Sequence, residues 1–221
     1  MSKKDYRLES DSMGQMRVPK NALYAAQTAR AIKNFPISDL KFKRPFIEAL
    51  GVIKFCAAKV NGDLKLIPKN ISKSIMKGAQ EVIDSKHDNE FVVDIFQTGS
   101  GTSTNMNANE VISSLANRYS KSKSKIHPND HVNLCQSSND VIPTAMHISA
   151  LKLANRDLIP SLKLLKKELD KKSKSFSKIY KIGRTHLQDA TPMTLGQEFG
   201  GFSQMVQNSI DFISSSSRNS S

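Results

Sequence analysis

Three polar segments carry most of the side chains that could do chemistry on a small acid. These are residues 99–110, GSGTSTNMNANE, residues 136–143, QSSNDVIP, and residues 183–198, GRTHLQDATPMTLGQE. Each runs into the start of a predicted helix, where unpaired N–H groups and the helix dipole favour carboxylates or phosphates. Their hydroxyl and amide groups add directional hydrogen-bond donors without adding charge. If the three segments meet, they predict a pocket for a small dicarboxylate.

Helix capping is the alternative interpretation, because Ser, Thr, Asn and Asp are also the preferred N-cap residues. It is weakest for residues 99–110, since a cap needs one such residue and seven of these twelve are Ser, Thr or Asn. His186 lies in the third segment, in what the sequence predicts to be a loop just before a helix. There it could be a solvated residue, a cap, a metal ligand or an acid/base.

Two other kinds of site fit the sequence less well. Residues 99–110 lack the Gly-Lys-Ser/Thr ending of a phosphate-binding P-loop. Residues 127–131, HPNDH, place two histidines four positions apart, as a metal-binding helix face could. The proline and the Asn-Asp pair favour a turn instead, so we expect no metal.

The spacing of apolar residues predicts a mainly α fold. The predicted helices span residues 44–63, 68–86, 107–119, 143–179 and 194–212. In the first, the apolar stripe consists of Phe46, Leu50, Ile53, Ala57 and Val60. Pro160 makes the fourth either one bent rod or two helices in series. Thr194 and Gln197 are spaced as a capping box, and the long helices indicate a bundle.

The composition favours a globular chain with small-molecule partners. The 221 residues are 38% hydrophobic and carry a formal charge of +13. The lysines are spread along the chain without interleaved aromatic residues, so we expect no nucleic-acid partner. Cys56 and Cys135 form no metal-spaced pair, and we expect both to be reduced and buried. Without an apolar signal region or a run long enough to span a membrane, we expect a cytoplasmic protein with no membrane partner.

Seven stretches stand in an order and spacing typical of one family. They are SMGQMRVP (12–19), ALYAAQT (22–28), QTGSGTSTNMNANE (97–110), HPNDHVN (127–133), QSSND (136–140), PTAMHI (143–148) and GRTHLQDATPMTLGQEF (183–199). The chain resembles class II fumarate hydratase, of the aspartase/fumarase superfamily, over about residues 5–212. Aspartate ammonia-lyase is the close alternative, since it shares the GSGTSTNMN and HPND stretches. It typically has glutamine in place of His186 and threonine in place of Ser138, so the resemblance favours fumarase.

The resemblance implies a carbon–oxygen lyase that hydrates fumarate reversibly to L-malate, a tricarboxylic acid cycle reaction, without a metal or organic cofactor. The residues implied to bind the substrate are Ser100, Thr102, Ser137, Ser138, Asn139 and Thr185. His186 is implied to be catalytic, transferring a proton through a bound water, a task that suits a group with an unperturbed pKa near 6.5. A second dicarboxylate site near the entrance is implied for His127, Asn129 and Asp130.

The resemblance also implies the architecture. Residues 1–137 correspond to the family's N-terminal domain and residues 138–212 to the first part of its central helical bundle, and residues 213–221 are a serine-rich tail that we expect to be disordered. In the family, four subunits join through their bundles into a homotetramer, and each active site draws segments from three subunits.

One family element is absent from these 221 residues: the GSSxMPxKxN loop, which carries a serine base and a lysine and an asparagine that bind substrate. Two hypotheses follow. The chain is a fumarase polypeptide that is active only when another chain supplies the missing half, or it is a non-catalytic remnant that binds dicarboxylates or associates with intact subunits.

Overall fold

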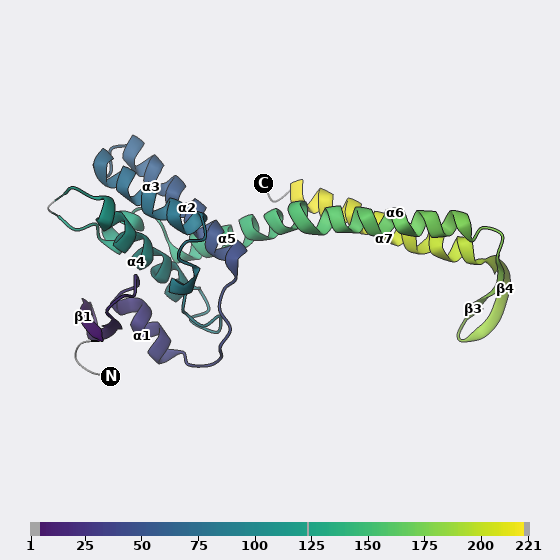
Figure 1. Ribbon diagram of the computed structural model, residues 1–221, viewed down its shortest axis with the longest axis horizontal. Coiled ribbons are helices and arrows are strands. Elements are labelled where there is room, and N and C mark those ends of the chain that lie inside the picture. Colours follow the sequence, from purple (N-terminus) through teal and green to yellow (C-terminus); the bar gives the residue numbers. More distant parts are fainter. Residues whose placement is uncertain (1–4, 123, 219–221) are drawn as a thin grey trace. The chain divides into compact units, whose positions relative to one another are not determined.

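The mainly α prediction is confirmed by the computed structural model, which describes residues 5–122 and 124–218 (Figure 1). The chain divides into two compact units, Met1–Ser149 and Ala150–Ser221, and the division falls within helix α5 (Ser138–Leu153). The boundary expected between residues 137 and 138 stays a prediction. No helix among the described residues is both long and apolar enough to cross a membrane.

Three helices form the core of the first unit: α2 (Arg44–Asp63), α3 (Lys69–Ile83) and α4 (Thr102–Tyr119). The predicted helix over residues 44–63 is confirmed, with a proline in its first turn, where the missing N–H group is not needed. Gly78 lets α3 and α4 approach closely, because a Cβ there would lie 2.9 Å from the carbonyl oxygen of Ile112. The side chains fully buried between these helices include Leu50, Ile75, Val82, Val111, Ile112 and Leu115.

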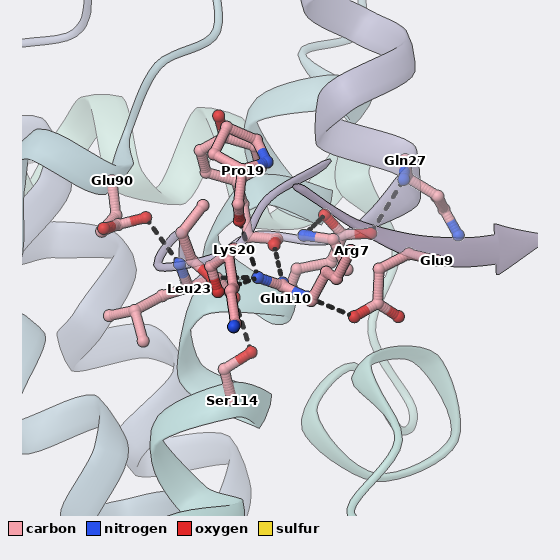
Figure 2. A network of polar contacts seen from close by, with 12 residues as sticks. Arg7, Glu9, Pro19, Lys20, Leu23, Gln27, Glu90, Glu110 and Ser114 are labelled. Atoms are coloured by element: carbon pink, nitrogen blue, oxygen red, sulfur yellow. Dashed lines mark hydrogen bonds and ion pairs between the residues drawn. The ribbon is translucent and has the colours of Figure 1, made fainter. Parts of the chain in front are cut away.

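An N-terminal segment is tied to this core by side chains that bond to its backbone (Figure 2). It consists of an antiparallel pair, β1 (Tyr6–Asp11) and β2 (Gly14–Pro19), followed by α1 (Ala26–Asn34). Arg7 donates to the carbonyl oxygens of four residues in the connection, at 2.7–3.1 Å: Pro19, Lys20, Ala22 and Tyr24. These bonds satisfy polar backbone groups that have no partner in a helix or sheet.

The buried carboxylate of Glu110 holds the start of α1. It accepts hydrogen bonds from the backbone N–H groups of Ala25 (2.8 Å), Gln27 (2.9 Å) and Thr28 (3.1 Å). Helix α1 has no side-chain cap of its own from Ala25. A residue of α4 therefore replaces the N-cap and places a negative charge at the positive end of the α1 dipole.

The second unit is a pair of long helices that lie side by side, α6 (Ile159–Ser175) and α7 (Leu195–Arg218), joined through a β-hairpin (Figure 1). The hairpin strands are β3 (Tyr180–Thr185) and β4 (Gln188–Thr194), and the sequence did not predict them. The expected capping box at the start of α7 is confirmed. The backbone N–H of Gln197 donates to Thr194 Oγ1 at 3.1 Å, and that of Thr194 donates to Gln197 Oε1 at 2.8 Å.

The segment that contains Pro160 is helical without a break from residue 138 to residue 175. Helix α5 is followed by a π-helical turn, η3 (Ala154–Leu158), and then by α6, with the proline in its first turn. A π turn absorbs one residue beyond the α-helical repeat, and proline is tolerated in a first turn.

Two expectations differ from the structure. Residues 213–218, expected to be disordered, continue α7, and serines there bond back to carbonyl oxygens of the preceding turn, such as Ser217 Oγ to Ile213 O at 2.8 Å. Residues 219–221 of the expected tail lie outside the described residues. Cys56 and Cys135, expected to be buried, are exposed. Cys56 lies on the solvent side of α2, and Cys135 lies in a tight turn with φ of 59°.

Candidate functional site

Two of the three polar segments meet in the first unit. Ser138, at the start of α5, accepts a hydrogen bond from Asn105 Nδ2 on α4 at 3.0 Å. Gly101, just before α4, lies against α5, because a Cβ there would come within 2.7 Å of Ile142 Cγ1. The loop that carries Ser100 and Thr102 is therefore adjacent to the helix start that carries Ser138.

Ser100 and Thr102 are exposed at the N-terminus of α4. Their hydroxyl oxygens lie 2.9 Å apart, so one donates to the other. The N-terminal capping is done by a different residue, since Gln97 Oε1 accepts from the backbone N–H of Thr104 at 3.0 Å. The two hydroxyl groups thus face solvent at the positive end of a helix, which is a suitable place for a carboxylate.

At the start of α5, one serine hydroxyl caps the helix, and other polar groups are available to a ligand. Ser137 Oγ accepts from the backbone N–H of Asn139 at 3.3 Å, so the capping interpretation holds for this serine. Ser138 Oγ accepts a hydrogen bond from Asn105, and its hydroxyl proton is still available to be donated. Ser137 and Asn139 are exposed, and Ser138 is half-buried.

Most of the remaining polar residues of the segment 99–110 serve the protein interior rather than a ligand. Helix α4 begins at Thr102, five positions before the predicted start at residue 107, and residues 104–110 are all buried. Asn107 bonds to Glu90 O (2.9 Å) and accepts from the backbone N–H of Val92 (3.1 Å). Because buried polar groups need partners, the abundance of Asn there reflects a helix surrounded by protein.

A buried lysine was missed by the sequence analysis. Lys54 on α2 has no exposed surface, and its Nζ donates to Asn133 Oδ1 and Gln136 Oε1, each at 2.9 Å. Burial lowers the pKa of Lys54 to about 7. The signal that could have found it is its place four residues after Leu50 and four before Ala58, both buried on the same face of α2.

The residues expected to form a second dicarboxylate site lie at a π-helical turn, η2 (Pro128–Val132), so the prediction of a turn is confirmed. His127 and Asn129 line a cavity of about 560 Å³, together with Asp11, Gln27 and Lys125. His127 Nδ1 accepts from the backbone N–H groups of Asn129 (3.3 Å) and Asp130 (3.2 Å). The same nitrogen lies 3.2 Å from Asp130 Oδ2. Asp130 lies within this turn and is exposed.

Thr185 and His186 belong to the second unit and lie at the tip of its hairpin, not in a loop just before α7. Thr185 pairs with Gln188, and His186 and Leu187 form the two-residue turn. Both turn residues have positive φ, 49° and 64°, as a type I′ turn requires. Neither is glycine or asparagine, so the turn is strained by about 1 kcal/mol per residue. Both side chains are exposed, and such strain is common at functional positions.

The comparison with known families decides the affiliation. A family model described as lyase matches residues 14–220, nearly the whole chain. The chain belongs to the lyase family. This lyase is 54% identical over 215 residues to a class II fumarate hydratase of Halobacterium salinarum, covering 95% of this chain and 45% of the relative. It is 55% identical over 207 residues to that of Xylella fastidiosa, covering 93% and 43%.

Solved structures give the same result for the fold of the lyase. The class II fumarase of Schistosoma mansoni matches with a TM-score of 0.87 and 44% identity, over 93% of this chain and 44% of that one. A fumarate lyase:delta crystallin of Brucella melitensis matches with a TM-score of 0.90 and 38% identity, over 97% and 51%. The predicted fumarase/aspartase fold is confirmed, and the lyase spans just under half the length of the curated relatives it matches.

Gly101 of this lyase offers a test of the junction between the two segments. Its φ of 69° disfavours side chains, and a Cβ would press on Ile142. We expect Gly101→Ala to lower the free energy of unfolding by about 2 kcal/mol. Gly99→Ala, where a Cβ would meet no atom within 4 Å, is the matched control and should leave the urea midpoint unchanged. Equal midpoints for the two variants would contradict the close contact with α5.

Proposed function

We propose that this lyase chain supplies part of the active site of a fumarate hydratase, which interconverts fumarate and L-malate. The observation that carries the proposal is the junction of the Ser100–Thr102 loop with the start of α5, at two helix N-termini. The similarity to class II fumarate hydratases supports it. The proposed substrate-binding groups are those at Ser100, Thr102, Ser137, Ser138, Asn139 and Thr185.

The proposed chemistry follows from the charge that the reaction develops. Removing a proton from the carbon next to a carboxylate of malate spreads a second negative charge over that carboxylate. Hydroxyl, amide and backbone N–H donors arranged beforehand stabilise this charge in the transition state. His186 would move a proton between a bound water and the hydroxyl that leaves or enters, which is general acid/base catalysis. A second dicarboxylate at His127, Asn129 and Asp130 remains part of the proposal.

The second unit supports an oligomeric enzyme. Ile159 and Ile210 are its only large aliphatic side chains buried among the described residues. Several apolar side chains of α6 and α7 are exposed: Leu164 (66%), Leu165 (49%), Phe202 (47%), Met205 (67%) and Phe212 (72%). A pair of helices with so little core of its own needs further helices to cover these side chains. We propose that subunits associate here, as a homotetramer, and that the cytoplasm is its location.

A mixing experiment tests the function. The chain is combined with a separately produced C-terminal half of a class II fumarase, and loss of the fumarate absorbance is followed. We expect hydration in the mixture and none from either part alone, because the chain spans less than half of its relatives. No turnover in a mixture that forms a stable complex would contradict the proposal.

Two other outcomes separate the alternatives. Adding ammonium to the mixture with fumarate distinguishes an aspartate ammonia-lyase from a fumarate hydratase. The ammonia-lyase would form aspartate, whereas the hydratase would form malate. If no mixture turns over fumarate but calorimetry shows that the chain binds it, the hypothesis of a non-catalytic, dicarboxylate-binding chain is supported instead.

A further inference from the structure

The buried amine of Lys54 joins two residues on either side of a tight turn. Asn133 and Gln136 flank Cys135, whose φ of 59° lies in the left-handed region. Besides their bonds to Lys54, the two residues bond to each other, Asn133 Nδ2 donating to Gln136 O at 3.1 Å. Gln136 Nε2 also donates to Val132 O at 2.9 Å. The amine therefore lies at the centre of the turn that leads directly into α5.

The same network reaches the α4 side of the candidate site. Asn133 Oδ1 accepts from Asn105 Nδ2 and Asn109 Nδ2, each at 3.1 Å, in addition to Lys54. Asn105 is also the residue that donates to Ser138 Oγ. One amide oxygen thus links α2, α4 and the turn before α5.

Burying an amine costs more free energy than burying an apolar side chain of similar size. Removing an ammonium or amine from water is unfavourable, and an apolar side chain would pack at α2 with less cost unless a donor is needed there. The titratable groups on the elements around α2 include Glu81 and Lys77 on α3, Glu110 on α4, Asp130 and His131 on η2, and Asp140 on α5. None of them bonds to Lys54 in the part of the chain that the structure describes. The partners of Lys54 are amide oxygens of the turn.

We propose that Lys54 is a positioning residue that fixes the turn before α5 and thereby the placement of Ser137, Ser138 and Asn139. The part of the inference that concerns dicarboxylate binding rests on the proposed function. The part that concerns the geometry of the turn is independent of the proposed function, so the two parts can be tested separately.

The first test observes the amine directly in the free chain. Lysine side chains labelled with ¹³C are titrated by NMR in the wild type, in Lys54→Met and in Gln136→Glu. We expect one lysine to titrate near 7, to vanish in Lys54→Met, and to titrate at least one unit higher in Gln136→Glu, which puts a carboxylate beside the amine. Lys59→Met, at an exposed position of the same helix, should leave this titration in place.

The second test measures what the amine positions. In Lys54→Met, we expect the backbone amide resonances of residues 136–139 to shift, whereas those of Lys59→Met stay as in the wild type. In the mixture with a C-terminal half, Lys54→Met should raise KM for fumarate about tenfold with a smaller change in kcat, since it loosens groups that bind the carboxylate.

The outcomes separate the two proposals. A folded Lys54→Met with unchanged resonances at residues 136–139 overturns the positioning role, whether or not any mixture is active. An inactive wild-type mixture counts against the proposed function, while the resonances still decide the role of Lys54. If Lys54→Met does not fold, an unmoved lysine titration in Gln136→Glu overturns the inference.

Discussion

Replacing His186 with asparagine is expected to lower fumarate hydration by the complemented enzyme about 100-fold or more, without loss of folding. The rate should fall because a positioned general acid/base contributes on the order of 10²- to 10⁴-fold. The fold should persist because His186 has a φ of 49°, and asparagine adopts this left-handed region readily. The measurement is kcat in the mixture with a C-terminal fumarase half, with circular dichroism as a check of folding.

His147→Asn is the matched control, since this histidine is exposed on α5 and has no proposed role. It should leave kcat unchanged. If His186→Asn turned over fumarate as fast as the wild type, His186 would be removed from the mechanism, and its strained position would need another explanation.

Replacing Glu110 with alanine is expected to lower the free energy of unfolding by about 3 kcal/mol or more. Glu110 is 4% exposed, and its carboxylate accepts hydrogen bonds from three backbone N–H groups at the start of α1. Alanine leaves the buried N–H of Thr28 and the part-buried N–H groups of Ala25 and Gln27 without this partner. A buried donor without a partner costs about 1–3 kcal/mol. Urea unfolding measures the change, and limited proteolysis should show faster cleavage between β2 and α1.

Asp63→Ala provides the control for loss of a carboxylate as such. Asp63 pairs with Lys59 at the exposed end of α2, and its removal should leave the urea midpoint in place. Similar midpoints for Glu110→Ala and the wild type would mean that the N-terminal segment is held chiefly by other contacts, such as those of Arg7.

The sequence predicted the helices better than the faces they bury. Helix α2 begins and ends where its pattern indicated, but Val60 of the predicted stripe is 52% exposed, whereas Lys54 and Asn61 are buried. A polar residue at an interior position does not register as core in an apolar pattern. Spacing from buried neighbours can place such a residue on the buried face, but its polar partners are more than seventy positions away, such as Leu134 for Asn61.

The hairpin was missed for a local reason. Strands β3 and β4 are mostly exposed and alternate weakly, so they lack the period of a half-buried strand. Their turn also lacks the Asn-Gly or Asp-Gly pair that usually indicates a hairpin.

The exposure of the polar residues around the start of α4 could be predicted only in part. The hydroxyl donors expected at Ser100 and Thr102 are exposed. Whether a neighbouring Asn faces a ligand or the protein interior depends on which elements cover α4.

The His186–Leu187 turn has a consequence for anyone who redesigns this chain. A procedure that scores local backbone preference would choose Asn-Gly at these two positions early, because that pair relieves about 1 kcal/mol of strain at each residue. The redesigned protein would melt at a higher temperature and, under the proposed function, would have lost its proton-transfer group. At this turn, selection for folding and selection for turnover favour different residues, so a thermostable homologue that kept a histidine there would have had to gain its stability elsewhere.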